Sequence, residues 1–121
     1  MYELTVEDHF AAAHRLREYE GECENLHGHN WRVQVRVVAE RLGKLGMVMD
    51  FRELKHSLGQ VLSELDHTYL NEVPPFDREN PTTENLCRHI AARMGDLLPE
   101  GVGVGRVSCW ESEKCSASYS P

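Results

Sequence analysis

The hydrophobic patterns along the chain predict an α+β fold with the order β-β-α-α-β-β, in which two helices cover one face of an antiparallel sheet. Two N-terminal segments alternate between apolar and polar residues, two later segments repeat at helical spacing, and alternation returns near the C-terminus. The 121 residues suffice for one domain, which we expect to span residues 1–121.

The first two strands are predicted from alternation with a period of two. Between Tyr2 and Ala12 most apolar residues occupy even positions, so they share one face of a strand. In the segment 30–40, the odd positions from Trp31 to Val37 are all apolar and the positions between them are mostly polar. These segments are therefore expected to form strands with one buried face.

Two helices are expected next. The apolar side of the first comprises Phe51, Leu54, Leu58, Val61, Leu62 and Leu65. Asp50 followed by Glu53 resembles a capping box, which predicts that this helix begins there. A second helix is expected from about Thr83, with an apolar stripe of Leu86, Ile90, Met94 and Leu97. The prolines between the two helices predict a loop.

The C-terminal segments 102–112 and 115–119 alternate again and predict a closing hairpin. Four strands would leave two open sheet edges, which proteins usually cover or pair. Association of subunits through the sheet is one way to cover them.

Composition and charge exclude some classes of function. The net charge of −7 argues against nucleic-acid binding, which uses clustered Lys and Arg. No apolar run approaches the roughly 18 residues of a membrane helix, and the N-terminus lacks signal-peptide features, so we expect a cytoplasmic protein. The four cysteines form no C-x-x-C pair, which fits a reducing compartment.

Three histidines predict a metal site. His27 and His29 are separated by one glycine, so an extended backbone would direct both imidazoles to the same side. His14 ends the run HFAAAH, where small alanines leave room for a ligand. Three imidazoles would leave one open position on a tetrahedral zinc ion, as in catalytic sites. An H-x-H motif alone fits packed or surface histidines equally well.

Other titratable residues offer further candidates. Asp66 and His67 place a carboxylate beside an imidazole at a helix end, where a histidine also interacts favourably with the helix dipole. Cys23, four residues before His27, is either a packed thiol or a thiolate whose pKa a nearby cation would lower. The remaining histidines are interpreted as surface residues; they include His9, His56 and His89.

These motifs resemble those of the 6-pyruvoyltetrahydropterin synthase and 6-carboxytetrahydropterin synthase family, nearer to its bacterial 6-carboxy members. In order, they are FAAAH ending at His14, C-x-x-x-H-G-H from Cys23, MVMDF-x-E-L-K from Met47, L-D-H ending at His67, N-P-T-T-E from Asn80, and Glu111. The resemblance implies a T-fold subunit. It also implies a homohexamer built as a dimer of trimers, with active sites at subunit interfaces.

The resemblance further implies roles for individual residues: zinc bound by His14, His27 and His29, Cys23 as the proton-abstracting base, and Asp66 with His67 as a proton relay from a neighbouring subunit. Glu111 would bind the pterin ring, whose adjacent N–H donors suit one carboxylate. Thr83 and Glu84 either line the same pocket or are simply favourable at a helix N-terminus. The candidates for holding a triphosphate are Arg15, Arg17, Lys44 and Lys55.

The implied reaction converts 7,8-dihydroneopterin triphosphate to 6-carboxy-5,6,7,8-tetrahydropterin, with release of acetaldehyde and triphosphate, for queuosine and related deazapurines. Such an enzyme is a carbon–carbon lyase. One alternative is the carbon–oxygen lyase that eliminates triphosphate to give 6-pyruvoyltetrahydropterin. Another makes 6-hydroxymethyl-dihydropterin for folate through Glu24. Two further classes stay open from the residues alone, a hydrolase that activates water and a non-catalytic zinc- or pterin-binding subunit.

Overall fold

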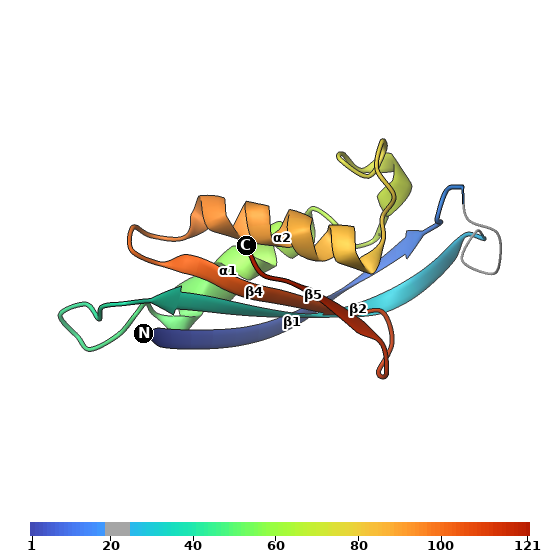
Figure 1. Cartoon of the computed structure of the whole chain (residues 1–121). Helices are drawn as coiled ribbons and strands as arrows, with labels where there is room; N and C mark the ends of the chain where they lie inside the picture. The colour runs from blue at the N-terminus through green and yellow to red at the C-terminus, as the bar shows by residue number, and fades with distance from the viewer. Residues whose placement is uncertain (19–24) are drawn as a thin grey trace.

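The computed structural model describes residues 1–18 and 25–121. Five strands form one sheet in the order β3-β1-β2-β4-β5, and both helices lie on the same face of it (Figure 1). The elements are β1 (Tyr2–His14), β2 (His27–Ala39), α1 (Phe51–Ser63), β3 (Thr68–Tyr69), the 3-10 helix η2 (Leu70–Glu72), α2 (Thr83–Leu97), β4 (Gly103–Trp110) and β5 (Ser116–Tyr119). The predicted α+β class is confirmed.

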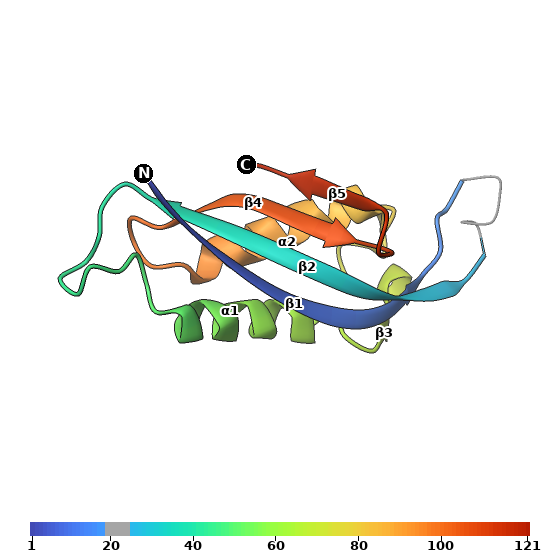
Figure 2. The same ribbon diagram turned by 90° about the horizontal axis from the view of Figure 1, so that it is seen from below.

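The strands β1 and β2 form a long antiparallel pair of 13 residues each. Tyr2 lies opposite Ala39 at one end of the pair, and His14 lies opposite His27 at the other. Figure 2 shows both strands crossing the length of the molecule, seen from the side of the sheet that carries no helix. The predicted alternation therefore sets which side chains of both strands point toward the helices.

The prediction of a wholly antiparallel sheet is wrong at one edge. The two-residue strand β3 runs parallel to β1, beside Ala12 and Ala13. The turn before β3 is bound to β1 as well, because the His67 amide donates to the Ala11 carbonyl at 2.6 Å. A strand of two residues is too short to show alternation, so the sequence pattern could not predict β3.

The helix α1 begins where it was predicted. The Asp50 side chain accepts a hydrogen bond from the Arg52 amide at 2.7 Å and so caps the first turn. Phe51, expected on the buried side, is 52% exposed, and it lines a hollow with Leu4 of β1 and Met49. Leu65 is fully buried although the helix ends at Ser63.

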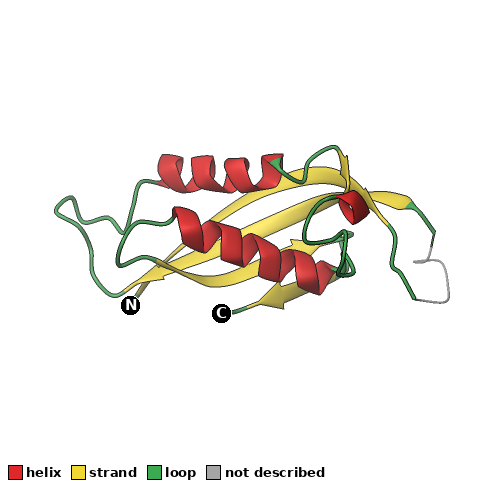
Figure 3. Cartoon of the chain, turned by 90° about the horizontal axis from the view of Figure 1, so that it is seen from above, coloured by secondary structure: helices red, strands yellow, loops and turns green. Residues whose placement is uncertain are grey.

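The helix α2 begins after Thr82, whose side chain accepts from the Asn85 amide at 3.1 Å. Three members of the predicted stripe are fully buried, and the last, Leu97, is 37% exposed. The helix α1 contacts β1, whereas α2 contacts β4 and β5, so the two helices cover different parts of the sheet (Figure 3).

The hydrophobic core fills the layer between the helices and the sheet, and it ends at the histidines. Trp31 is completely buried, and its ring lies 6.0 Å from that of Phe10 and 5.1 Å from that of His14. The core cluster therefore reaches as far as the His14 end of β1 and β2. In residues 1–18 and 25–121, no helix is long and apolar enough to cross a membrane.

Candidate metal centre

Three imidazoles meet where β1 and β2 end. His14 lies opposite His27 in the strand pair, and His29 lies opposite Ala12, two residues away on the same side of the sheet. The ring centres are 4.5 Å apart for His14 and His27, and 4.7 Å apart for His27 and His29. The strand register alone therefore brings the three predicted side chains together.

Backbone carbonyls orient two of these imidazoles. The Nδ1 atom of His14 donates to the Pro81 carbonyl at 2.8 Å, and that of His27 donates to the Asn25 carbonyl at 2.6 Å. Because a carbonyl can only accept, each proton lies on Nδ1 and each Nε2 presents a lone pair. These two Nε2 atoms face each other at 3.0 Å. Two facing lone pairs repel each other unless a cation lies between them.

Glu111 adds a carboxylate to the cluster. Its Oε1 lies 3.0 Å from His29 Nε2, and its Oε2 accepts a hydrogen bond from the Thr83 hydroxyl at 3.1 Å. The approach of Oε1 does not follow the direction of an N–H bond, and His29 Nε2 has no hydrogen-bond partner among the described residues. One ligand atom from each of the four side chains lies within 4.8 Å of the others. The cluster thus has the orphaned nitrogen and the converging donors that a metal ion would satisfy.

The protonation states also favour a cation in the cluster. Burial lowers the pKa of His14, although its hydrogen bond to Pro81 opposes that shift. Burial lowers the pKa of His29 too, against the opposing charge of Glu111. Both imidazoles are therefore neutral near pH 7, which is the form that binds metals. Imidazole nitrogens with a carboxylate oxygen are a donor set typical of zinc.

Asp66 and His67 lie at the β3 edge, outside this cluster. The two side chains contact each other, with His67 Nδ1 2.9 Å from Asp66 Oδ2, and the His67 side chain is 83% exposed. Asp66 Oδ1 accepts from the Ala11 amide at 2.9 Å, and this bond lowers the pKa of the carboxyl group. His67 lines a hollow of about 360 Å³ with residues of β1 and β2. An exposed His67 is open to contact from outside its own chain.

Several predicted residues lie elsewhere. Cys23 and Glu24 fall outside the described residues. Glu84 is exposed in the first turn of α2. Lys44 follows the far end of β2, roughly 40 Å from the histidines of the same chain at 3.3 Å per residue.

One triphosphate candidate has its guanidinium bound within the fold, and one sequence interpretation is wrong. The Arg17 guanidinium donates to the carbonyls of Asn71, Phe76 and Glu79, so its hydrogen bonds hold the fold together. His89, interpreted as a surface residue, is partly buried, with its ring 5.3 Å from that of Phe76. Neither contact was visible in the sequence because both involve the loop between the helices.

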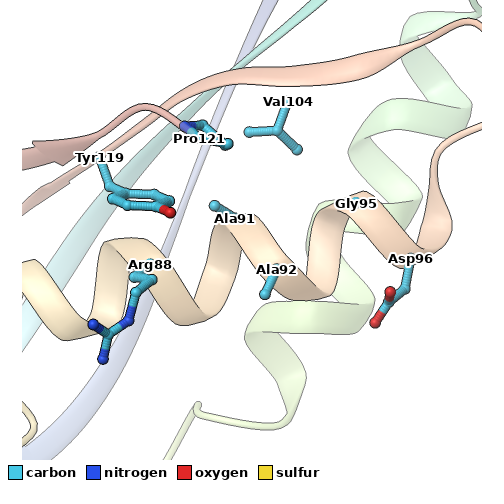
Figure 4. Close-up of a pocket in the computed structure, with 8 residues that line it drawn as sticks. All are labelled: Arg88, Ala91, Ala92, Gly95, Asp96, Val104, Tyr119 and Pro121. Atoms are coloured by element: carbon cyan, nitrogen blue, oxygen red, sulfur yellow. The ribbon is translucent and has the colours of Figure 1, made fainter.

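A separate cavity lies between α2 and the strands β4 and β5. It measures about 280 Å³, and Figure 4 shows its lining. The lining residues are Arg88, Ala91, Ala92, Gly95, Asp96, Val104, Tyr119 and Pro121. The lining contains neither histidine nor cysteine, so the cavity lacks the metal-binding chemistry of the histidine cluster.

The two-helix α+β fold with a histidine–carboxylate cluster at the end of its sheet defines a protein with a candidate metal centre. The chain belongs to the 6-pyruvoyl tetrahydropterin synthase family, whose model matches residues 3–121. It is 40% identical to the 6-carboxy-5,6,7,8-tetrahydropterin synthase of Synechocystis, over 84% of this chain and 81% of that protein.

Two other relatives widen the comparison. The chain is 41% identical to the dihydroneopterin monophosphate aldolase of Pyrococcus furiosus, over 87% of this chain and 85% of that protein. Its fold matches the 6-pyruvoyl tetrahydropterin synthase structure from Caenorhabditis elegans with a TM-score of 0.85 and 29% identity, over 100% of this chain and 97% of that one. Relatives that are 29% to 41% identical to this chain thus carry three different activity names.

Proposed function

We propose that the protein is a zinc-dependent carbon–carbon lyase that converts 7,8-dihydroneopterin triphosphate to 6-carboxy-5,6,7,8-tetrahydropterin, releasing acetaldehyde and triphosphate, in queuosine biosynthesis. The observation that carries the proposal is the convergence of His14, His27, His29 and Glu111. The Synechocystis relative of that name supports the choice of product.

The three histidines would hold zinc, with Pro81 and Asn25 fixing the tautomers of two of them. Bound zinc would supply a Lewis acid for an oxygen of the pterin side chain. Glu111 would bind the pterin by accepting its adjacent N–H groups, and the Thr83 hydroxyl keeps that carboxylate in place.

Proton transfer would use residues outside the cluster. Cys23, close in sequence to His27, would remove a proton from the substrate as a thiolate. Asp66 holds His67 in an exposed position, from which the imidazole can pass protons to a site on a neighbouring subunit. This arrangement requires an assembly, and we propose the family's hexamer, a dimer of trimers, in the cytoplasm.

A second candidate function is cleavage to 6-hydroxymethyl-dihydropterin. The 41% identity to the Pyrococcus aldolase favours it, and Glu24 beside Cys23 offers a second base. A third, triphosphate elimination to 6-pyruvoyltetrahydropterin, matches the name of the Caenorhabditis structure.

Incubation of the zinc-loaded protein with dihydroneopterin triphosphate, and separately with the monophosphate, tests these functions by mass analysis of products. We expect the 6-carboxy product from the triphosphate. A hydroxymethyl product, from the monophosphate above all, would favour the aldolase instead. Binding of both compounds without turnover would indicate a non-catalytic pterin-binding subunit.

A further inference from the structure

Two asparagines bind the main chain where β1 leaves the sheet. Asn71 accepts from the Arg15 amide at 2.9 Å and donates to the Arg15 carbonyl at 2.8 Å. Asn80 repeats this arrangement with Arg17, at 2.8 Å and 3.0 Å. We call these two side chains, with the main chain of Arg15 and Arg17, the asparagine clamp.

The clamp replaces a neighbouring strand. β3 pairs with β1 only as far as Ala13, so the residues after His14 have no strand on that edge. A primary amide offers one acceptor and a donor on the same edge, which matches the main-chain amide and carbonyl of one residue. Residue 15 follows β1 directly and residue 17 lies in the turn after it, and both are bound in this way. The clamp thus binds the main chain beyond the last pairing of β1 with β3.

The same segment that contains Asn80 also orients the histidine cluster. The carbonyl of Pro81 accepts from His14 Nδ1, and the hydroxyl of Thr83 donates to Glu111. The carbonyl of Asn80 accepts from the Asn85 side chain at 2.9 Å, which ties the segment to the first turn of α2. Residues 80–83 therefore contact the chain after His14, the His14 imidazole and the Glu111 carboxylate together.

Asn71 and Arg17 also bind each other through the Arg17 side chain. Asn71 is 8% exposed, and its own carbonyl accepts from the Arg17 guanidinium at 3.0 Å. A buried amide with both of its polar atoms bonded resists movement, because breaking either bond leaves a desolvated group without a partner.

We propose that Asn71 and Asn80 are positioning residues for catalysis, which set the path of the chain leaving His14 relative to the Pro81 and Thr83 contacts of the histidine cluster. The proposal rests on the proposed function, because it concerns the reaction at that cluster. If the clamp only stabilised the fold, Asn80 would not need to lie in the same segment as Pro81 and Thr83, which contact His14 and Glu111.

The test compares Asn80→Ala with Asn80→Asp in the zinc-loaded protein. The alanine variant loses both clamp bonds to Arg17, whereas the aspartate variant keeps the acceptor for the Arg17 amide. Two neutral hydrogen bonds change an equilibrium by roughly ten- to a hundredfold. We expect Asn80→Ala to lower kcat by that factor with KM and zinc content nearly unchanged, and Asn80→Asp to lower it at least as much, because its second carboxylate oxygen would face the Arg17 carbonyl.

Arg93→Ala is the matched control for lost stability. Arg93 joins α2 to Glu64 through bonds of 2.7 and 3.2 Å, away from the histidine cluster. It should lower the unfolding temperature without lowering kcat. An unchanged kcat in Asn80→Ala, or an equal loss of kcat in Arg93→Ala, would overturn the proposal. The test uses Asn80, which is half-buried, in place of the buried Asn71.

A second readout separates this proposal from the proposed function. If the wild type turned over no pterin, the visible spectrum of the cobalt-substituted protein would still report the geometry at His14. Asn80→Ala should change that spectrum and Arg93→Ala should not. A spectrum of Asn80→Ala identical to that of the wild type would then overturn the clamp's positioning role.

Discussion

At the His14 end of the β1–β2 pair, buried and half-buried polar groups lie together and nearly all of those described are bonded, beside one exposed large apolar side chain, Leu26, whereas several large apolar side chains are exposed around the Tyr2 end. Leu45 is 83% exposed, Phe51 52% and Met47 42%. A buried polar group costs free energy unless it has a partner, so the His14 end needs particular residues at particular positions. Exposed apolar side chains make no hydrogen bonds, so their positions do not require particular residues. Single substitutions should therefore have large effects at one end and small effects at the other.

Removing one of the proposed metal ligands should have the largest effect on zinc binding and activity at the His14 end. We expect His27→Ala to lower zinc affinity by more than about a hundredfold, since even residues behind the ligands cost 10- to 100-fold. Activity should fall to background. Zinc content after dialysis measures this effect, and a stoichiometric zinc content in the variant would show that His27 is not a ligand.

Glu111→Gln should have the next largest effect. The amide keeps the size of the side chain but loses charge-assisted hydrogen bonds, which are worth about 1.5–3 kcal/mol. Pterin affinity should fall roughly ten- to a hundredfold while zinc stays bound. A titration with a pterin, monitored by fluorescence, measures this affinity. An unchanged affinity would remove Glu111 from the pterin site.

Acid should weaken the His14 end in the metal-free protein. Burial lowers the pKa of His14, His29 and His89. The unfolded chain, with histidine pKa values near 6.5, therefore binds more protons than the folded chain as the pH falls. The stability that these groups contribute is present above about pH 6.5 and is lost as the pH falls through their folded pKa values.

Thermal unfolding of the metal-free protein at a series of pH values measures this dependence. Replacing the partly buried His89 by leucine should make the dependence shallower, whereas the exposed His9→Gln should not. The same slope in both variants would assign the acid sensitivity to other groups.

The Tyr2 end should tolerate substitution. Leu45→Ser changes a side chain that is 83% exposed, and such surface changes usually alter the free energy of unfolding by less than about 0.5 kcal/mol. Urea denaturation checks the value. A loss above 2 kcal/mol would mean that another part of the molecule, or another subunit, covers this loop.

The strand and helix patterns predicted most of the fold because burial on one face imposes a period on long elements. The two residues of β3 are too few to show one. Phe51 keeps the helical period although its side chain is 52% exposed, because spacing alone does not show how far the buried face of a helix extends.

In the site, H-x-H spacing predicted that His27 and His29 share one side, and the HFAAAH run offered His14 as a third ligand. The structure brings the three together with Glu111, and their metal-binding role stays a prediction. The contacts behind them could not be predicted, because Pro81 and Asn25 act through main-chain carbonyls, which every residue has. The hydrogen bonds of Arg17 could not be predicted for the same reason, since its partners are main-chain carbonyls between the two helices.

The asparagine clamp holds Arg15 and Arg17 through their main chain, and the Asn25 carbonyl holds His27 from the other side of the connection. Anchors of this kind place few demands on the side chain of the anchored residue. Position 15 can therefore carry other side chains while the two hydrogen bonds that fix its main chain stay the same.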